Sequence, residues 1–80
     1  MGKPSKPSAE RLLACNLKHF RVARGWSQLQ LAEEAGLSRR LIEMMEGGTA
    51  NPSLKNLEKV AIAFHVEMAE LFVPRDDRGR

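Results

Sequence analysis

The sequence predicts an all-α fold, a compact five-helix bundle around one hydrophobic core. Two observations favour helices: apolar residues recur at spacings of three and four between residues 8 and 73, and serines stand before most of these stretches while glycine or proline follows them. A third observation excludes a sheet, because no stretch alternates polar and apolar residues with the period of two typical of a half-buried strand.

The first helix is predicted over residues 9–24. Ser8 is a suitable N-cap, and Gly25 is suited to the left-handed conformation that often follows a helix. The apolar residues of this segment recur at the spacing of one helical face, formed by Leu13, Leu17 and Phe20.

Two short helices follow. Ser27 and Gln30 form the S-x-x-Q pattern of a capping box, which predicts that a second helix begins there. Gly36 ends this helix, and Ser38 caps a third helix over residues 39–46. Two short helices joined by a three-residue turn that begins with glycine have the helix-turn-helix arrangement.

The last two helices follow a loop that is rich in glycine and polar residues. Ser53 is the predicted N-cap of the fourth helix, whose apolar stripe comprises Leu54, Leu57, Val60, Ala61 and Phe64. A short fifth helix is expected over residues 67–72, with Leu71 and Phe72 directed inward, and Pro74 ends it.

The charge of the chain is concentrated outside the expected bundle. We expect a flexible basic arm over residues 1–7, the folded domain over residues 8–73 and a flexible charged tail over residues 74–80. The net charge is +3, from 13 basic and 10 acidic residues, but residues 8–73 carry eight of each and are neutral. A basic composition therefore gives no argument for nucleic-acid binding by the folded part.

Several function classes are not expected. The longest apolar run has four residues, residues 61–64, so no membrane span is predicted, and no secretory signal is recognised. The single cysteine, Cys15, excludes an internal disulfide and favours a reducing, cytoplasmic location. Cys15 and His19 lie four residues apart but supply only two of the four ligands of a structural zinc site. We expect no metal, no cofactor, no small-molecule substrate and no enzymatic activity.

The third predicted helix has an outward side suited to reading DNA. Arg39 and Arg40 suit the bidentate recognition of guanine, Glu43 can accept from cytosine N4, and Met44 can contact a thymine methyl group. The opposite side of this helix is apolar and comprises Leu41, Ile42 and Met45. On this helix alone, an ordinary solvated surface of charged residues explains the same pattern.

The wider sequence context favours DNA. The string LKHFRVARGWSQ at residues 17–28, followed by Leu31-Ala32, Gly36-Leu37-Ser38 and Asn51-Pro52-Ser53, resembles the lambda-repressor-like (Cro/XRE) helix-turn-helix family over about residues 10–73. That resemblance implies a five-helix bundle that binds operator DNA, usually as a twofold dimer, and regulates transcription.

The resemblance also assigns roles to residues of this chain. It implies phosphate contacts by Ser27, Gln28, Ser38, Gly47, Gly48 and Lys55, and base contacts by Arg39, Arg40 and Met44. It implies that Arg21 and Glu46 form a structural pair between the first and third helices. The flexible arm, with Lys3 and Lys6, is expected to follow the DNA backbone or minor groove.

The family's dimer contacts commonly use the last helix and the loop before it. In this chain the corresponding residues are Val66, Met68, Ala69, Leu71 and Phe72. A second interpretation is that Leu71 and Phe72 complete the core of the single chain. We therefore predict a sequence-specific transcriptional regulator that binds a roughly palindromic operator as a homodimer. The alternative is an antitoxin or transcription accessory protein whose main role is to bind a protein partner such as a toxin.

Several residues depart from the usual family pattern, and two of them bear on the geometry of the bundle. Leu29 occupies a position that is commonly polar, so we expect its side chain to be exposed. His65 replaces a frequent glycine, which raises a question about the backbone geometry after the fourth helix.

Overall fold

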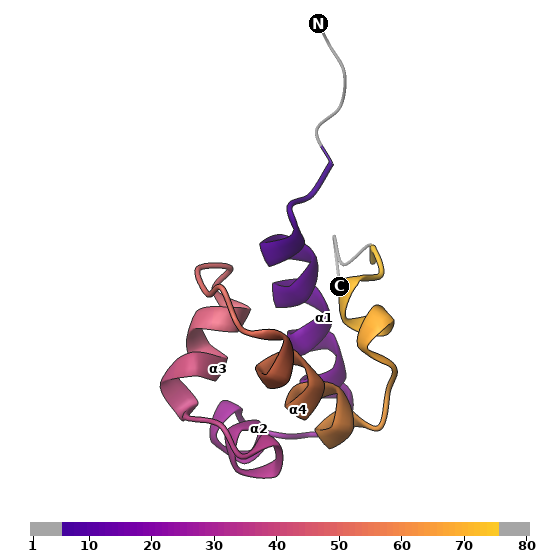
Figure 1. Cartoon of the computed structure of the whole chain (residues 1–80). Helices are drawn as coiled ribbons and strands as arrows, with labels where there is room; N and C mark the ends of the chain where they lie inside the picture. Colours follow the sequence, from indigo (N-terminus) through magenta and orange to yellow (C-terminus); the bar gives the residue numbers. More distant parts are fainter. Residues whose placement is uncertain (1–5, 76–80) are drawn as a thin grey trace, which may run out of the picture.

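The computed structural model of the chain describes residues 6–75, and all regular structure in that range is helical (Figure 1). The elements are α1 (Ala9–Ala23), α2 (Gln28–Ala35), α3 (Arg39–Glu46), α4 (Leu54–Phe64) and the 3-10 helix η1 (Met68–Phe72). The all-α class is confirmed. The prediction of a fifth α-helix is wrong: residues 68–72 form a 3-10 helix, the tighter coil that short segments commonly adopt.

The predicted arm and tail lie partly outside the described residues. Lys3 and the rest of residues 1–5 are outside, as are residues 76–80, so the structure describes only the inner ends of both segments.

Each α-helix begins at a serine cap. The hydroxyl groups of Ser8, Ser27, Ser38 and Ser53 each accept a hydrogen bond from the backbone N–H three residues later, at 3.0–3.2 Å. An N-cap side chain satisfies one of the N–H groups that the first turn leaves without an intrahelical partner. The local sequence therefore fixes where all four helices begin.

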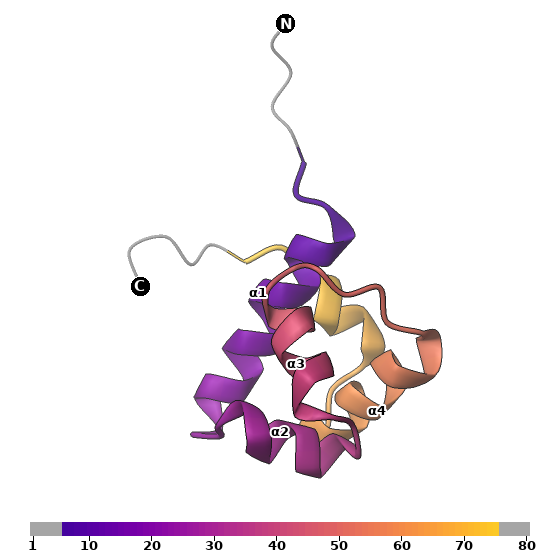
Figure 2. The same ribbon diagram turned by 90° about the vertical axis from the view of Figure 1, so that its left-hand side faces the viewer.

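The elements pack around a central core. α1 contacts α3 and η1, and α2 contacts α3 and α4. Figure 2 shows α3 in front, with α2 below it and α4 to its right, so one side of α3 faces outward. The largest fully buried apolar side chains come from all five elements and comprise Leu17, Leu31, Ile42, Met45, Val60, Phe64 and Leu71.

Two leucines on the surface test the predicted helix faces. Leu29 is 49% exposed, as expected from its departure from the family pattern. Leu54 was assigned to the inner stripe of α4, and that assignment is wrong, because its side chain is 76% exposed. Leu54 is the first residue of α4, where the neighbouring elements do not cover it, whereas Leu57 one turn later is buried.

Two of the helices end at a residue in the left-handed backbone conformation. Gly36 ends α2 in the left-handed conformation, with φ 70° and ψ 34°, which lets the chain reverse into Ser38 and α3. His65 ends α4 in the same conformation, with φ 61° and ψ 43°, and is the one non-glycine residue with positive φ within residues 6–75. The backbone therefore keeps the turn that glycine commonly makes in the family, at a cost in local strain.

A buried asparagine holds the segment after η1 against α1. Asn16 is fully buried, and its Nδ2 donates to the carbonyl oxygens of Leu12 and Val73, both at 2.8 Å. Its Oδ1 accepts from Arg75 Nε, and the Arg75 guanidinium lies 5.0 Å from the centre of the Phe20 ring. The first residues of the predicted C-terminal tail are thus attached to the bundle.

Candidate nucleic-acid interface

α3 presents a charged side to solvent because its other side is anchored in the core. Ile42 and Met45 are 0% and 1% exposed, which fixes the rotation of the helix about its axis. Arg39 and Arg40 are the first two residues of α3 and are exposed, and Met44, one turn further along the outer side, is 36% exposed. Two guanidinium groups therefore project from the beginning of an outward-facing helix.

Arg39 and Glu43 form an ion pair along this outer side. Arg39 Nε lies 3.0 Å from Glu43 Oε2, and the two side chains are 61% and 47% exposed. The residues are separated by four positions, so they lie one above the other on the helix. Glu43 therefore belongs to the same surface as the two arginines and compensates the charge of one of them.

The beginnings of α2 and α3 are both positively polarised. Neither helix has an acidic residue in its own first turn that would offset the positive end of the helix dipole. At α2, Ser27 and Gln30 form the predicted capping box, in which Ser27 N donates to Gln30 Oε1 at 2.7 Å. The N–H groups of the first two helical residues stay available, which is the arrangement that binds anions at helix N-termini.

A half-buried polar cluster connects α1, α2 and α3. Arg21 donates through Nε and Nη2 to the two carboxylate oxygens of Glu46, at 2.6 and 3.1 Å, and through Nη1 to the carbonyl oxygen of Trp26 at 2.8 Å. Gln28 Nε2 donates to Glu46 Oε1 at 3.2 Å. The Arg21 and Glu46 side chains are only 14% and 7% exposed, so this pair supports the position of α3 and is not itself a contact surface.

The loop after α3 begins with two glycines of different conformation. Gly47 continues the helical conformation, and a side chain there would bring its Cβ within 3.3 Å of the Glu43 carbonyl oxygen. Gly48 adopts φ 76°, which turns the chain so that Thr49 N donates to the Met44 carbonyl oxygen at 3.0 Å. Beyond the loop, Lys55 is exposed and lies 3.3 Å from Glu58.

The residues assigned to a dimer contact divide between core and surface. Leu71 is 0% exposed, so its side chain belongs to the core of the single chain and has no surface to offer a second one. Val66, Met68 and Phe72 are half-buried against that core, and Ala69 is exposed. The structure thus agrees with the second interpretation for Leu71.

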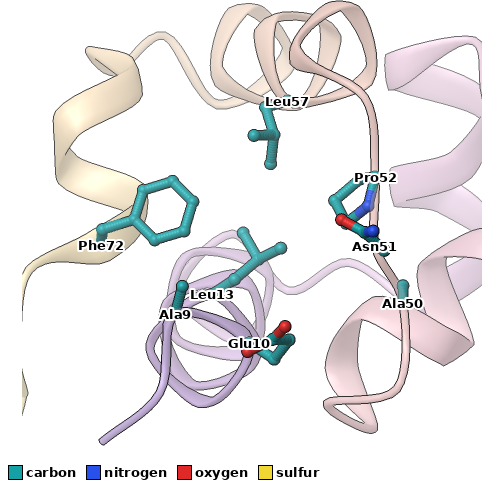
Figure 3. Close-up of a pocket in the computed structure, with 8 residues that line it drawn as sticks. All are labelled: Ala9, Glu10, Leu13, Ala50, Asn51, Pro52, Leu57 and Phe72. Atoms are coloured by element: carbon teal, nitrogen blue, oxygen red, sulfur yellow. The ribbon is translucent and has the colours of Figure 1, made fainter. Parts of the chain in front are cut away.

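A small pocket of about 180 Å³ opens beside the loop that follows α3 (Figure 3). Its lining is mostly apolar and comprises Ala9, Glu10, Leu13, Ala50, Asn51, Pro52, Leu57 and Phe72. Three of the lining residues, Ala50, Asn51 and Pro52, belong to the loop that follows the C-terminal end of α3. Within residues 6–75 there is no group of three potential metal ligands and no helix long and apolar enough to cross a membrane.

Comparison with known proteins identifies the family. A helix-turn-helix family model matches residues 17–71, which include α2, α3 and their connection. The chain belongs to the Cro/XRE-type helix-turn-helix family. A hypothetical transcription factor from Neisseria meningitidis is 37% identical over 75 residues, which cover 94% of this chain and 71% of the relative.

Solved structures of a transcription factor and of a controller protein share the fold. The crystal structure of the hypothetical transcription factor NHTF from Neisseria superposes with a TM-score of 0.84, at 36% identity over 98% of this chain and 90% of that one. The restriction-modification controller protein C.AhdI from Aeromonas hydrophila gives a TM-score of 0.75, at 38% identity over 79% of this chain and 96% of that one. The protein is therefore similar to DNA-binding transcriptional regulators, a family that is not one of enzymes.

Two side-chain contacts of the candidate interface were not predicted from the sequence. The ion pair between Arg39 and Glu43 has a local signal, because opposite charges four residues apart in a helix are neighbours. The bond from Gln28 to Glu46 has no such signal, because it joins residues 18 positions apart on different helices.

Proposed function

We propose that this protein is a sequence-specific transcriptional regulator that binds a roughly palindromic operator as a homodimer, with α3 in the major groove. The observation that carries the proposal is the exposure of Arg39 and Arg40 on α3, whose opposite side is fixed by Ile42 and Met45. An α-helix fits the major groove, and an arginine fork matches O6 and N7 of guanine.

Met44 extends this reading surface and is proposed to contact a thymine methyl group. It is the only apolar side chain on the outer side of α3 between residues 39 and 46, and its 36% exposure leaves part of it accessible. The outer side of α3 therefore combines two guanidinium groups with one apolar contact, which suits a recognition site of mixed base composition.

Phosphate contacts are proposed for the residues that surround α3. Gln28 is suited to this role because its Nε2 carries two N–H groups and only one of them is directed to Glu46. Backbone and hydroxyl groups at the helix ends and one exposed ammonium group supply the remaining contacts, from Ser27, Ser38, Gly47, Gly48 and Lys55. These contacts position α3 in the groove and carry no base preference themselves.

The proposed dimer surface keeps the partly exposed residues near η1. Val66, Met68, Ala69 and Phe72 remain in it, whereas Leu71 is omitted because it is buried in the single chain. A twofold dimer places two copies of α3 about 34 Å apart, one turn of DNA, so the operator has two related half-sites. The basic arm with Lys3 and Lys6 is proposed to add affinity by following the DNA backbone or minor groove.

Selection of binding duplexes from a random pool tests this proposal. At about 150 mM salt non-specific electrostatic binding is weak, so enrichment reports base recognition. We expect an enriched, roughly palindromic sequence with half-site centres about 10 base pairs apart. A protein that enriches no sequence and instead co-purifies with a stable protein partner contradicts the proposal and supports the alternative of an interaction module.

A further inference from the structure

We propose that Glu43 does not read a base itself but positions Arg39, and that the Arg39 guanidinium so held recognises a guanine in each half-site. This inference rests on the proposed function. It assigns to the acidic residue of the α3 surface a role different from that of a cytosine reader.

The geometry of the ion pair leaves the recognition edge of Arg39 accessible. Glu43 contacts Nε, the guanidinium nitrogen nearest the side-chain stem, at 3.0 Å. The two terminal nitrogens, Nη1 and Nη2, lie beyond this contact and form the fork that bonds bidentately to guanine O6 and N7. Glu43 therefore has its closest contact on the stem side of the group, and the Arg39 side chain is 61% exposed.

The energetics of the pair favour a role in binding over a role in folding. Both side chains are about half exposed, and exposed ion pairs of this kind contribute little to stability. The order is also the weaker one for a helix, because the cation lies nearer the positive N-terminal end. Two arginines at the first positions of α3 disfavour the free helix, so their placement serves an anionic partner better than it serves the fold.

An unpaired carboxylate on this surface would oppose DNA binding. Glu43 lies on the same side of α3 as Arg39 and would face the phosphate-rich groove, where a negative charge is repelled. When Glu43 is paired with Arg39, its charge is compensated. The pair also restricts the long arginine side chain before DNA binds, so that less conformational entropy is lost on binding. Preorganisation of this kind strengthens a directed contact without adding a new one.

The two roles for Glu43 make different predictions for base preference. A cytosine reader acts through its own contact, so its effect persists when Arg39 is removed. A positioning residue acts only through Arg39, so removing both side chains has no more effect on base preference than removing Arg39 alone. A double-mutant cycle therefore separates them.

The test measures dissociation constants for the selected operator and for every single-base-pair variant of one half-site. The proteins are the wild type, Arg39→Ala, Glu43→Ala and the double variant. Arg39→Ala should reduce the preference for guanine at one base pair by about 5- to 140-fold, the range of a lost bidentate contact. Glu43→Ala should reduce the preference at the same base pair by about 1.4- to 5-fold, the range of an exposed ion pair. In the Arg39→Ala background it should have no further effect.

Glu58→Ala is the matched control. Glu58 is 50% exposed, is paired with Lys55 at 3.3 Å and carries the same charge, but it lies on α4. Removal of the Glu58 side chain should leave base preference unchanged. A second readout is the affinity for non-cognate duplex. Glu43→Ala should bind such a duplex at least as tightly as the wild type does, because the substitution removes a negative charge from the DNA-facing side.

Three results would overturn the inference alone: an effect of Glu43→Ala at a different base pair, an effect that persists without Arg39, or no effect on preference. A wild-type protein without any base preference would overturn the proposed function and, with it, this inference. Circular dichroism of each variant shows that the compared proteins are folded.

Discussion

The ion pair between Arg21 and Glu46, whose side chains are only 14% and 7% exposed, should be a principal support of α3, and its removal gives a sharp stability prediction. Glu46→Gln keeps the shape of the side chain but leaves the Arg21 guanidinium, 14% exposed, without a countercharge. The variant also weakens the acceptor for Gln28. Breaking a buried pair by neutralising one partner typically costs about 3–5 kcal/mol. An 80-residue domain is typically stable by about 4–12 kcal/mol, so this loss is a large share of the total.

The assay is urea denaturation at 25 °C, followed by circular dichroism and tryptophan fluorescence. The free energy of unfolding should fall by about 3–5 kcal/mol in Glu46→Gln. The double variant Arg21→Met/Glu46→Leu replaces the pair by apolar side chains of similar size and should recover most of that loss. Glu58→Gln breaks the exposed pair with Lys55 and should cost less than about 1 kcal/mol. A loss below 1 kcal/mol in Glu46→Gln as well would refute the reasoning, because the pair would then behave like a surface pair.

Three further predictions follow from single residues of the structure. His65→Gly should raise the free energy of unfolding by about 1 kcal/mol and the melting temperature by about 4–8 °C, because glycine adopts the left-handed conformation without strain. A lower melting temperature would contradict this and mean that the imidazole makes a stabilising contact. Asn16→Leu should lower the free energy of unfolding by about 1–3 kcal/mol and increase amide hydrogen exchange in residues 66–75, because the carbonyl of Val73 loses its hydrogen-bond donor. Unchanged exchange in these residues would contradict the anchoring role of Asn16. Gln28→Ala should weaken binding to all duplexes without altering the selected sequence, as measured by anisotropy titration, and a changed sequence preference would contradict the proposed docking.

Local signals in the sequence predicted most of the fold. Ser8, Ser27, Ser38 and Ser53 mark the four α-helix starts because an N-cap depends only on the three residues that follow it. The last segment was harder, because five residues close to Pro74 favour α and 3-10 coils almost equally, and packing decides between them.

Contacts between distant residues were beyond the reach of sequence patterns. Asn16 lies on the predicted α1 but is buried by a bond to Val73, 57 positions away. Leu54 fits the apolar spacing of α4 but lies where no other element covers it. Both outcomes depend on the positions of neighbouring elements, which the spacing of apolar residues within one helix does not encode.

The candidate site followed the same division. The outward side of α3 was predictable from the positions of Ile42 and Met45, which leave Arg40 and its neighbours exposed. The orientation of single side chains was not, since the bond from Gln28 to Glu46 depends on how α2 crosses α3.

The base preference of Arg40→Ala tests the central claim, that the outer side of α3 reads DNA sequence. The measurement compares wild type and variant on the selected operator and on all its single-base-pair variants. A direct contact predicts that the variant loses about 1–3 kcal/mol on the operator and becomes indifferent at one base pair in each half-site. An equal loss on every duplex would make Arg40 a phosphate contact, and unchanged binding would place the DNA elsewhere on the protein.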